Sequence, residues 1–387
     1  MGLEDKCYEL LLNYTCNARC CFCSQENDLK TKKFLNIGLE EIIRKIFEAK
    51  KNGYTKLGLT GGEPLLRKDI IQIVKIAKKA GFKYIRIQTN GILLSDYVLA
   101  EKLMMAGVNF FKISIHSHIE DVNDYLMGVK FAYKSILRAI KNINKLKVRL
   151  SLSIVINKKN YKDLEKYVNF FLKRDVSEFI FVFPVYIANM EKNKKELFVS
   201  YQDVVPFLRK AYRNLEINGI KDYLFFNIPP CFLPERVDKI IGISLFNSTL
   251  YSPMGEYDLD TNSDEDSVKL TACKKCIYEN RCRGINIFYI SIIKNVDLVP
   301  VIKEKKIKNI IKKKKHFYTS SEKCFLEILR KENKINTKRV LEVAKTIPLC
   351  MDCDSSINAI NAGESLVDKG VVKKTFVNDD YIWVVNI

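Results

Sequence analysis

The segment Cys16-Asn17-Ala18-Arg19-Cys20-Cys21-Phe22-Cys23 decides how the rest of the chain is interpreted. Three residues separate Cys16 from Cys20, and two separate Cys20 from Cys23. Four cysteines normally bind the four irons of a [4Fe-4S] cluster, so three cysteines leave one iron open to another ligand. Cys21 is adjacent to a ligand position and is not expected to be a ligand. The segment predicts a catalytic iron-sulfur site, with a structural zinc site as the alternative.

A second motif, Thr60-Gly61-Gly62-Glu63-Pro64, follows where a second strand should end. Together the two motifs resemble the radical S-adenosylmethionine (SAM) superfamily. Its signature is three cysteines with an aromatic residue before the last, followed by a Gly-Gly-Glu-Pro turn, and Phe22 occupies the aromatic position. The resemblance implies that Cys16, Cys20 and Cys23 hold a [4Fe-4S] cluster, and that SAM binds the open iron through its amino and carboxylate groups.

The same resemblance implies roles for the residues around SAM. Gly61 and Gly62 let the backbone approach the methionine moiety without a side chain in the way. Glu63 accepts a hydrogen bond from the SAM ammonium group, and Phe22 shields the adenine side.

Ser114 and Asn157, at the ends of later strands, are candidates for holding the ribose, carboxylate or adenine of SAM. Each is equally well explained as an ordinary turn residue. His116 and His118 follow the fourth predicted strand and are candidate proton donors near substrate. His118 is expected to be solvated, and His116 alone does not establish acid-base chemistry.

Up to about residue 184, short apolar runs alternate with amphipathic helical patterns, which is typical of βα units around a parallel sheet. The predicted strands are Glu9–Tyr14, Lys56–Thr60, Tyr84–Thr89, Phe110–Ile115, Arg149–Ile156 and Glu178–Phe183. Six units fit an α/β fold with a partial (β/α)6 TIM-like barrel, similar to the radical SAM core, better than a closed eight-unit barrel. Parallel barrels carry their chemistry at the carboxyl ends of the strands, and both motifs lie there.

Helix faces and helix ends are also visible in the sequence. The apolar residues expected on one face of the first helix are Ile42, Ile43, Ile46 and Phe47. Glycines lie where three helices should stop, at Gly53, Gly81 and Gly107.

Composition sets only broad limits on function. The 387 residues include 65 Lys and Arg against 45 Asp and Glu, a net charge of +20. Such a charge suits an acidic partner such as nucleic acid or an acidic peptide, and a general lysine-rich bias explains it equally well. Twelve cysteines without a preceding signal peptide indicate metal ligands in a reducing cytoplasm. The longest apolar stretch, residues 179–188, is far shorter than the roughly 20 residues that span a bilayer.

A second cysteine group lies downstream of the predicted barrel. Cys231 precedes Cys273, Cys276 and Cys282, which together supply four thiolates. The group resembles the auxiliary-cluster region that follows the barrel in many radical SAM enzymes, including peptide maturases of the SPASM/twitch type. Full SPASM domains carry more cysteines, so a single twitch-like auxiliary [4Fe-4S] cluster is the better match. Zinc also accepts four thiolates and is the alternative.

The carboxyl-terminal part looks like a winged-helix module. Its predicted elements are helices over Ser320–Glu332, Thr337–Thr346 and Ser355–Lys369, then a hairpin of residues 371–377 and 381–385. Winged helices bind DNA, RNA or peptides, so the resemblance does not fix a ligand. The third helix carries Asn358, Asn361, Glu364 and Asp368, a weak match to a DNA-reading helix. Peptide-modifying radical SAM enzymes often carry such an element, more often at the amino terminus.

One further metal site is a lower-ranking candidate. Cys350 and Cys353 have ligand spacing, and His316 or Cys324 would complete the set. The polar stretch Asp258–Ser267 is predicted to be an exposed loop.

These observations lead to one main hypothesis. Residues 1–220 are the barrel, 221–299 the auxiliary-cluster region and 300–387 the winged-helix-like domain. The resemblance implies reductive cleavage of SAM to a 5′-deoxyadenosyl radical, with an electron donor such as flavodoxin or ferredoxin, and hydrogen abstraction from a peptide or protein. The alternatives are RNA modification, cofactor biosynthesis, and a metal-stabilised winged-helix regulator that binds DNA.

Overall fold

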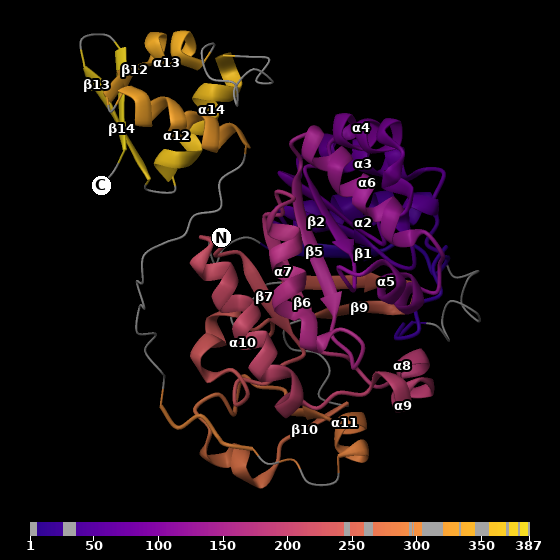
Figure 1. Ribbon diagram of the computed structural model, residues 1–387. Coiled ribbons are helices and arrows are strands. Elements are labelled where there is room, and N and C mark those ends of the chain that lie inside the picture. The colour runs from indigo at the N-terminus through magenta and orange to yellow at the C-terminus, as the bar shows by residue number, and fades with distance from the viewer. Residues whose placement is uncertain are drawn as a thin grey trace. The chain divides into compact units, whose positions relative to one another are not determined.

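The computed structural model describes residues 6–25, 36–243, 248–258, 266–293, 296, 298–303, 320–332, 334–344, 356–368, 371–377 and 380–385 (Figure 1). The chain separates into two compact units. The first comprises Met1–Glu216 and Ile220–Ile311, and the second comprises Ile217–Gly219 and Lys312–Ile387. Each unit has its own hydrophobic core.

The first unit is built on a mostly parallel sheet. Six of its strands match the prediction: β1 (Cys7–Leu11), β2 (Lys56–Thr60), β3 (Tyr84–Thr89), β4 (Phe110–Ser114), β5 (Arg149–Val155) and β6 (Glu178–Val182). They lie side by side in chain order, and every pair among them is parallel. The prediction of a partial (β/α)6 TIM-like barrel is therefore confirmed.

Three further strands extend the sheet and were not predicted. Parallel β7 (Tyr223–Phe226) pairs with β6, and parallel β8 (Ser248–Ser252) pairs with β1 on the opposite side. Antiparallel β9 (Gly255–Asp258) follows β8 at that edge. The first strand was also placed too late, because β1 ends at Leu11 and the chain to Tyr14 leads into the cysteine segment.

Helices follow the strands as expected for βα units (Figure 1). They are α2 (Leu39–Lys51), α3 (Ile70–Lys79), α4 (Tyr97–Ala106), α5 (Glu120–Met127), α6 (Ala132–Lys145) and α7 (Leu164–Leu172), then α8 (Ala188–Lys192), α9 (Lys194–Leu197), α10 (Tyr201–Ile217) and α11 (Ile287–Ile292). The three glycines expected at helix ends all have positive φ. The predicted apolar face of α2 was wrong at Phe47, which is exposed, whereas Ile42 and Ile46 are buried. In the described ranges no helix is long and apolar enough to cross a membrane.

One layer of the sheet carries a buried ion pair. Glu9 on β1 pairs with Arg86 on β3, across Gly58 of the intervening strand β2. A Cβ on Gly58 would lie 1.8 Å from the Glu9 carboxylate, so this glycine makes room for the pair. Burial acts to raise the pKa of Glu9, but Arg86 and Lys112 outweigh it and lower the pKa below its usual value. This layer of the barrel is thus held by charge as well as by apolar packing.

A small irregular region follows the last strands. It contains β10 (Ser267–Val268), paired antiparallel with β11 (Ile285–Asn286), and the short helices η4 (Pro234–Lys239) and η5 (Thr271–Lys275). The predicted loop Asp258–Ser267 begins in β9 and ends in β10, so its two ends were assigned wrongly. Its interior, residues 259–265, lies outside the described residues.

The second unit has its elements in the order α12 (Ser320–Glu332), β12 (Lys334–Asn336), α13 (Thr337–Ala344), α14 (Ser356–Asp368), β13 (Val372–Val377) and β14 (Asp380–Val385). Its sheet has the order β12-β14-β13. The three predicted helices and the hairpin are present, and β12 was missed. Trp383 is buried against Phe325, with ring centroids 5.2 Å apart. The third metal-site candidate lies outside the described residues at His316, Cys350 and Cys353, and the side chain of Cys324 is not described.

Candidate functional site

The segment with the first three cysteines leaves the carboxyl end of β1 and is anchored on α5. The backbone N–H groups of Arg19 and Cys21 donate to the carbonyls of Met127 and Leu126, both at 3.0 Å. Helix ends leave carbonyls without partners inside the helix, and here the cysteine segment satisfies two of them. Gly128 follows with φ +63, and a Cβ there would lie 2.4 Å from the Arg19 carbonyl oxygen. The close approach therefore requires glycine at position 128.

The three thiols predicted as ligands are brought together in one environment. Burial raises the pKa of Cys20 well above its ordinary value, and the charges of Cys23 and Cys16 raise it further. The Cys16 sulfur accepts hydrogen bonds from the Ala18 N–H at 3.4 Å and from the Asn90 side-chain amide at 3.9 Å. Hydrogen bonds to the sulfurs are among the features that tune iron-sulfur clusters. Metal binding requires thiolates and would stabilise the charge that burial opposes, so this donor set fits such a cofactor.

The described residues contain no group of three His, Cys, Asp or Glu side chains arranged for a single metal ion. The ligands of a four-iron cluster each bind a different iron and need not meet at one point. The neighbouring Cys21 makes a contact within the protein instead. Its thiol donates to the Leu126 carbonyl at 3.4 Å, and burial raises its pKa to about 11.

The Gly-Gly-Glu turn packs directly on the chain that enters the cysteine segment. The N–H of Gly62 donates to the Asn13 carbonyl at 2.7 Å, and the N–H of Glu63 donates to the Thr15 carbonyl at 2.8 Å. A Cβ on Gly61 would lie 2.5 Å from the Asn13 carbonyl oxygen, and one on Gly62 would lie 2.4 Å from that of Thr15. Both glycines are therefore required for packing within the protein. Their approach to SAM stays a prediction.

Glu63 is fully buried at the centre of a hydrogen-bond network. Its carboxylate accepts from the Leu65 N–H at 3.0 Å, the Thr89 hydroxyl at 2.7 Å and the Asn90 N–H at 2.8 Å. Burial raises its pKa to about 7, although these hydrogen bonds act in the opposite direction. Because Asn90 also reaches Cys16, Glu63 links the ends of β2 and β3 to the cysteine segment. Asn90, directly after the third strand, was not among the predicted site residues.

The remaining predicted SAM residues lie at the same end of the barrel. Phe22 is half-buried, and its ring meets the edge of His116 at 4.4 Å between centroids. Ser114 is half-buried at the end of β4, opposite Ser153. Asn157 is fully buried, and its side chain accepts from the Lys159 N–H at 2.9 Å and donates to the Val155 carbonyl at 3.1 Å. Asn157 thus has the turn role that the sequence left open as its alternative.

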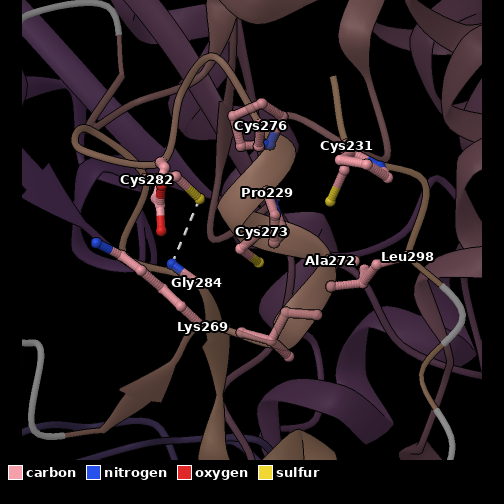
Figure 2. Close-up of a pocket in the computed structure, with 13 residues that line it drawn as sticks. Pro229, Cys231, Lys269, Ala272, Cys273, Cys276, Cys282, Gly284 and Leu298 are labelled. Carbon is pink, nitrogen blue, oxygen red and sulfur yellow. Dashed lines mark hydrogen bonds between the residues drawn. The ribbon is translucent and has the colours of Figure 1, made fainter. Parts of the chain in front are cut away.

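The second cysteine group lines one pocket of about 420 Å³, open solvent included. Figure 2 shows the sulfur atoms of Cys231, Cys273 and Cys282 directed toward the same space. Cys276 also lines this pocket, whose walls are otherwise mostly apolar, with Pro229, Pro230, Ala272, Ile285, Leu298 and Pro300. The structure therefore gathers all four predicted ligands, from segments more than 40 residues apart in the sequence.

The environment of this pocket suits the binding of a metal centre by the cysteine thiolates. Burial, then the charges of Cys282 and Cys273, raise the pKa of Cys231 to about 12. The Gly284 N–H donates to the Cys282 sulfur at 3.3 Å (Figure 2). Gly284 has φ +96, and a Cβ there would lie 2.2 Å from the Val268 carbonyl oxygen. The close contact between β10 and this loop therefore requires glycine and brings the N–H donor to the sulfur.

A larger cavity of about 900 Å³, open solvent included, adjoins this pocket. It lies beyond the carboxyl ends of β6 and β7 and shares Pro229, Pro230, Cys282 and Gly284 with the cysteine pocket. Its apolar lining comes from Pro184, Val185, Tyr201, Phe226, Ile228, Ile240, Ile241 and Ile243. Its polar residues, within the described ranges, are Asn227, Asp266, Ser267, Arg283 and Asn286. Sequence analysis did not identify this cavity, because its walls come from six separated segments.

Comparisons with known proteins indicate the same family as the cysteine segment and the Gly-Gly-Glu turn. The family described as the Radical SAM superfamily matches residues 10–171. A probable GTP 3′,8-cyclase of Sulfurisphaera tokodaii is 30% identical over 219 residues, which are 56% of this chain and 67% of that protein. A probable GTP 3′,8-cyclase of Saccharolobus solfataricus is 33% identical over 177 residues, which are 46% of this chain and 55% of that protein.

Among solved structures, Streptococcus suis SuiB bound to precursor peptide SuiA has a similar fold. Its TM-score is 0.57 at 16% identity, over 79% of this chain and 76% of that chain. The chain belongs to the radical SAM superfamily, whose members are iron-sulfur enzymes that use SAM. The cofactors that accompany this membership are a [4Fe-4S] cluster and SAM. The chain spans 67% and 55% of the length of the two curated relatives.

Proposed function

We propose that this chain is a radical SAM enzyme that modifies a peptide or protein. Cys16, Cys20 and Cys23 would hold the SAM-binding [4Fe-4S] cluster. When bound, this cluster supplies the electron that splits SAM into methionine and a 5′-deoxyadenosyl radical, which abstracts hydrogen from substrate. Phe22, Gly61, Gly62, Glu63 and Ser114 would enclose SAM. Asn157, whose side chain bonds within its own turn, would hold the wall of the SAM site in place.

The observation that carries the substrate class is the lining of the cavity of about 900 Å³, open solvent included, beside the auxiliary cysteines. Its walls are prolines, isoleucines and aromatic residues, with Asp266 and Arg283 as the charged residues among those described. A nucleoside triphosphate brings several negative charges and is usually held by several Lys or Arg groups. An apolar cavity with a few amide and hydroxyl groups suits a peptide segment better, because a peptide offers side chains and uncharged backbone.

The four downstream cysteines have a proposed role in this scheme. Cys231, Cys273, Cys276 and Cys282 would hold an auxiliary [4Fe-4S] cluster, with zinc as the alternative. Four protein ligands close every iron, which favours electron relay over direct substrate binding. A flavodoxin or ferredoxin would supply electrons to the enzyme. The barrel would comprise residues 1–220 together with β7, β8 and β9, which extend its sheet. The rest of 221–299 would form the auxiliary region, and 300–387 the winged-helix-like domain.

The second unit would grip the substrate peptide as a winged-helix-like module. On α14, Glu364 is paired with Lys374, and Asn361 is exposed. This helix contains no Lys or Arg, so only its asparagines suit duplex reading, which relies on Arg, Lys, Asn and Gln side chains. RNA or DNA binding predicts retention that falls steeply with added salt.

Cofactor biosynthesis is the second candidate, because the curated relatives are named GTP 3′,8-cyclases. It predicts that GTP binds and is consumed with 5′-deoxyadenosine formation.

The proposal is tested with the anaerobically reconstituted, dithionite-reduced enzyme. SAM is supplied with GTP or with a pool of synthetic peptides that differ at one central residue, and mass spectrometry follows both.

A mass change in peptides, with GTP unchanged, supports the proposal. Conversion of GTP refutes it in favour of the second candidate. The Cys16→Ala, Cys20→Ala and Cys23→Ala variants should each abolish 5′-deoxyadenosine formation, which checks the cluster ligands. Iron and zinc analysis of Cys231→Ala and Cys273→Ala decides the identity of the auxiliary metal: loss of about four irons is expected, and loss of zinc would refute the auxiliary cluster.

A further inference from the structure

The backbone carbonyls of the first cysteine segment are satisfied from far along the chain. Asn189 and Asn193, in and just after α8, lie about 170 residues beyond this segment. The Asn189 side-chain amide donates to the Cys20 carbonyl at 3.0 Å, and the Asn193 side-chain amide donates to the Cys21 carbonyl at 2.8 Å. The backbone N–H of Asn189 donates to the Cys23 carbonyl at 3.2 Å.

The two asparagines are themselves fixed in place. The Asn193 amide also donates to the Asn189 carbonyl at 3.0 Å, so the pair forms one unit. Met190, between them, is fully buried. Ala188, immediately before Asn189, has φ +49, a left-handed conformation that an alanine adopts only at an energetic cost. Backbone strain of this kind is retained where the surrounding structure demands one orientation.

The two sides of the cysteine segment are therefore held by different elements. Its N–H groups donate to the end of α5, at Met127 and Leu126, while its carbonyls accept from the α8 region. A segment held through both kinds of backbone group has little freedom to rotate. The directions of the three Cα–Cβ bonds, and hence of the sulfurs, follow from that restraint.

We infer that Asn189 and Asn193 are positioning residues of the amino-terminal metal site. They act through the backbone of the ligand segment and touch neither SAM nor substrate in this scheme. Without their amides, the Cys20 and Cys21 carbonyls lose partly buried partners and the segment can rotate away from the geometry that three irons require. The inference rests on the proposed ligand role of Cys16, Cys20 and Cys23.

The test is the rate of iron release from the anaerobically reconstituted full chain to a ferrous chelator. Asn189→Asp and Asn193→Asp keep the side-chain shape and replace the donor with an acceptor. Each is expected to accelerate the release of the SAM-binding cluster about fivefold, which corresponds to one net hydrogen bond. Electron paramagnetic resonance of the reduced protein, with and without added SAM, identifies which cluster is lost.

Asn142→Asp is the matched control. The Asn142 amide likewise donates to distant carbonyls, at 2.9 and 3.1 Å, but these belong to Leu94 and Ser95 and not to the cysteine segment. Asn193→Gln retains an amide donor and should release iron more slowly than Asn193→Asp. Circular dichroism confirms that each variant folds.

The outcomes separate this inference from the proposed function. If the wild-type chain binds no iron through Cys16, Cys20 and Cys23, the proposed function itself fails. If it binds iron and both Asp variants release it at the wild-type rate, or if Asn142→Asp is equally fast, the positioning role is refuted while the ligand assignment stands.

Discussion

Mild acid should destabilise the barrel through one buried imidazole, that of His116. This side chain is 3% exposed, and its Nδ1 accepts from the Val155 N–H at 3.2 Å. An acceptor nitrogen must be unprotonated, and burial lowers the pKa of His116 to about 3. The ring therefore stays neutral in the folded protein at pH values where it is charged in the unfolded chain.

The direction and the size of the change in stability with pH follow from this difference in proton binding between the folded and unfolded chain. Below about pH 6.5 the unfolded chain takes up a proton on His116 that the folded protein does not bind until about pH 3. Stability is thus lost as the pH falls through that window, by about 1.4 kcal/mol per unit. Between pH 6.5 and pH 5 the free energy of unfolding should fall by about 2 kcal/mol from this group alone.

Urea unfolding of the metal-free chain at several pH values measures the effect, with far-ultraviolet circular dichroism as the signal. His116→Gln retains an acceptor for Val155 but cannot titrate, so its unfolding free energy should depend less on pH by about 2 kcal/mol over that interval. His118→Gln is the control: burial also lowers the pKa of the half-buried His118, but less than that of His116, so a smaller change is expected. If His116→Gln keeps the full wild-type pH dependence, the burial argument is wrong.

Three further substitutions, one of them with a matched control, have definite expected results. Gly363→Ala should lower the urea concentration at the midpoint of unfolding, as reported by Trp383 fluorescence. The added Cβ would lie 2.6 Å from the Phe325 ring. Such overpacking costs roughly 1–3 kcal/mol, whereas the higher helix propensity of alanine contributes about 1 kcal/mol. Gly128→Ala should reduce the iron bound on reconstitution, because its Cβ would displace the cysteine segment. Gly53→Ala is the control and should leave the bound iron unchanged. Gly53 also has a positive φ of +83, but an added Cβ there would meet nothing within 4 Å. Cys21→Ala should leave iron stoichiometry unchanged and lower stability by about 1 kcal/mol through its lost hydrogen bond.

The barrel strands could be predicted because each is a local apolar run followed by an amphipathic helix. Lys56–Thr60 and Tyr84–Thr89 agree with the prediction at both ends. The missed strands lack that local signal. Ser248–Ser252 becomes a strand by pairing with Cys7–Leu11, about 240 residues earlier, and no sequence window contains both partners.

The candidate site shows the same division between local and distant information. The spacing of Cys16, Cys20 and Cys23 is local and was readable, as was the Gly-Gly-Glu turn. The partners that orient these residues come from other strands and helices: Asn90 on the cysteine sulfur and Asn189 on a cysteine carbonyl. Asn90 follows a strand and Asn189 lies in a short helix, and asparagine is common enough that neither position stood out.

The turn Gly61-Gly62-Glu63 has a structural function that must be separated from any contact with SAM. The Asn13 side-chain amide donates to the Glu63 carbonyl at 3.0 Å, so the turn is joined to the chain before Cys16 through side chains as well as backbone. The Glu63 carboxylate accepts from Asn90, whose side chain reaches the Cys16 sulfur. Replacing Glu63 would therefore disturb the metal-binding segment before any cofactor arrives. A Glu63 variant that loses activity identifies a SAM contact only if two properties are unchanged: its iron content and the electron paramagnetic resonance spectrum of its reduced cluster.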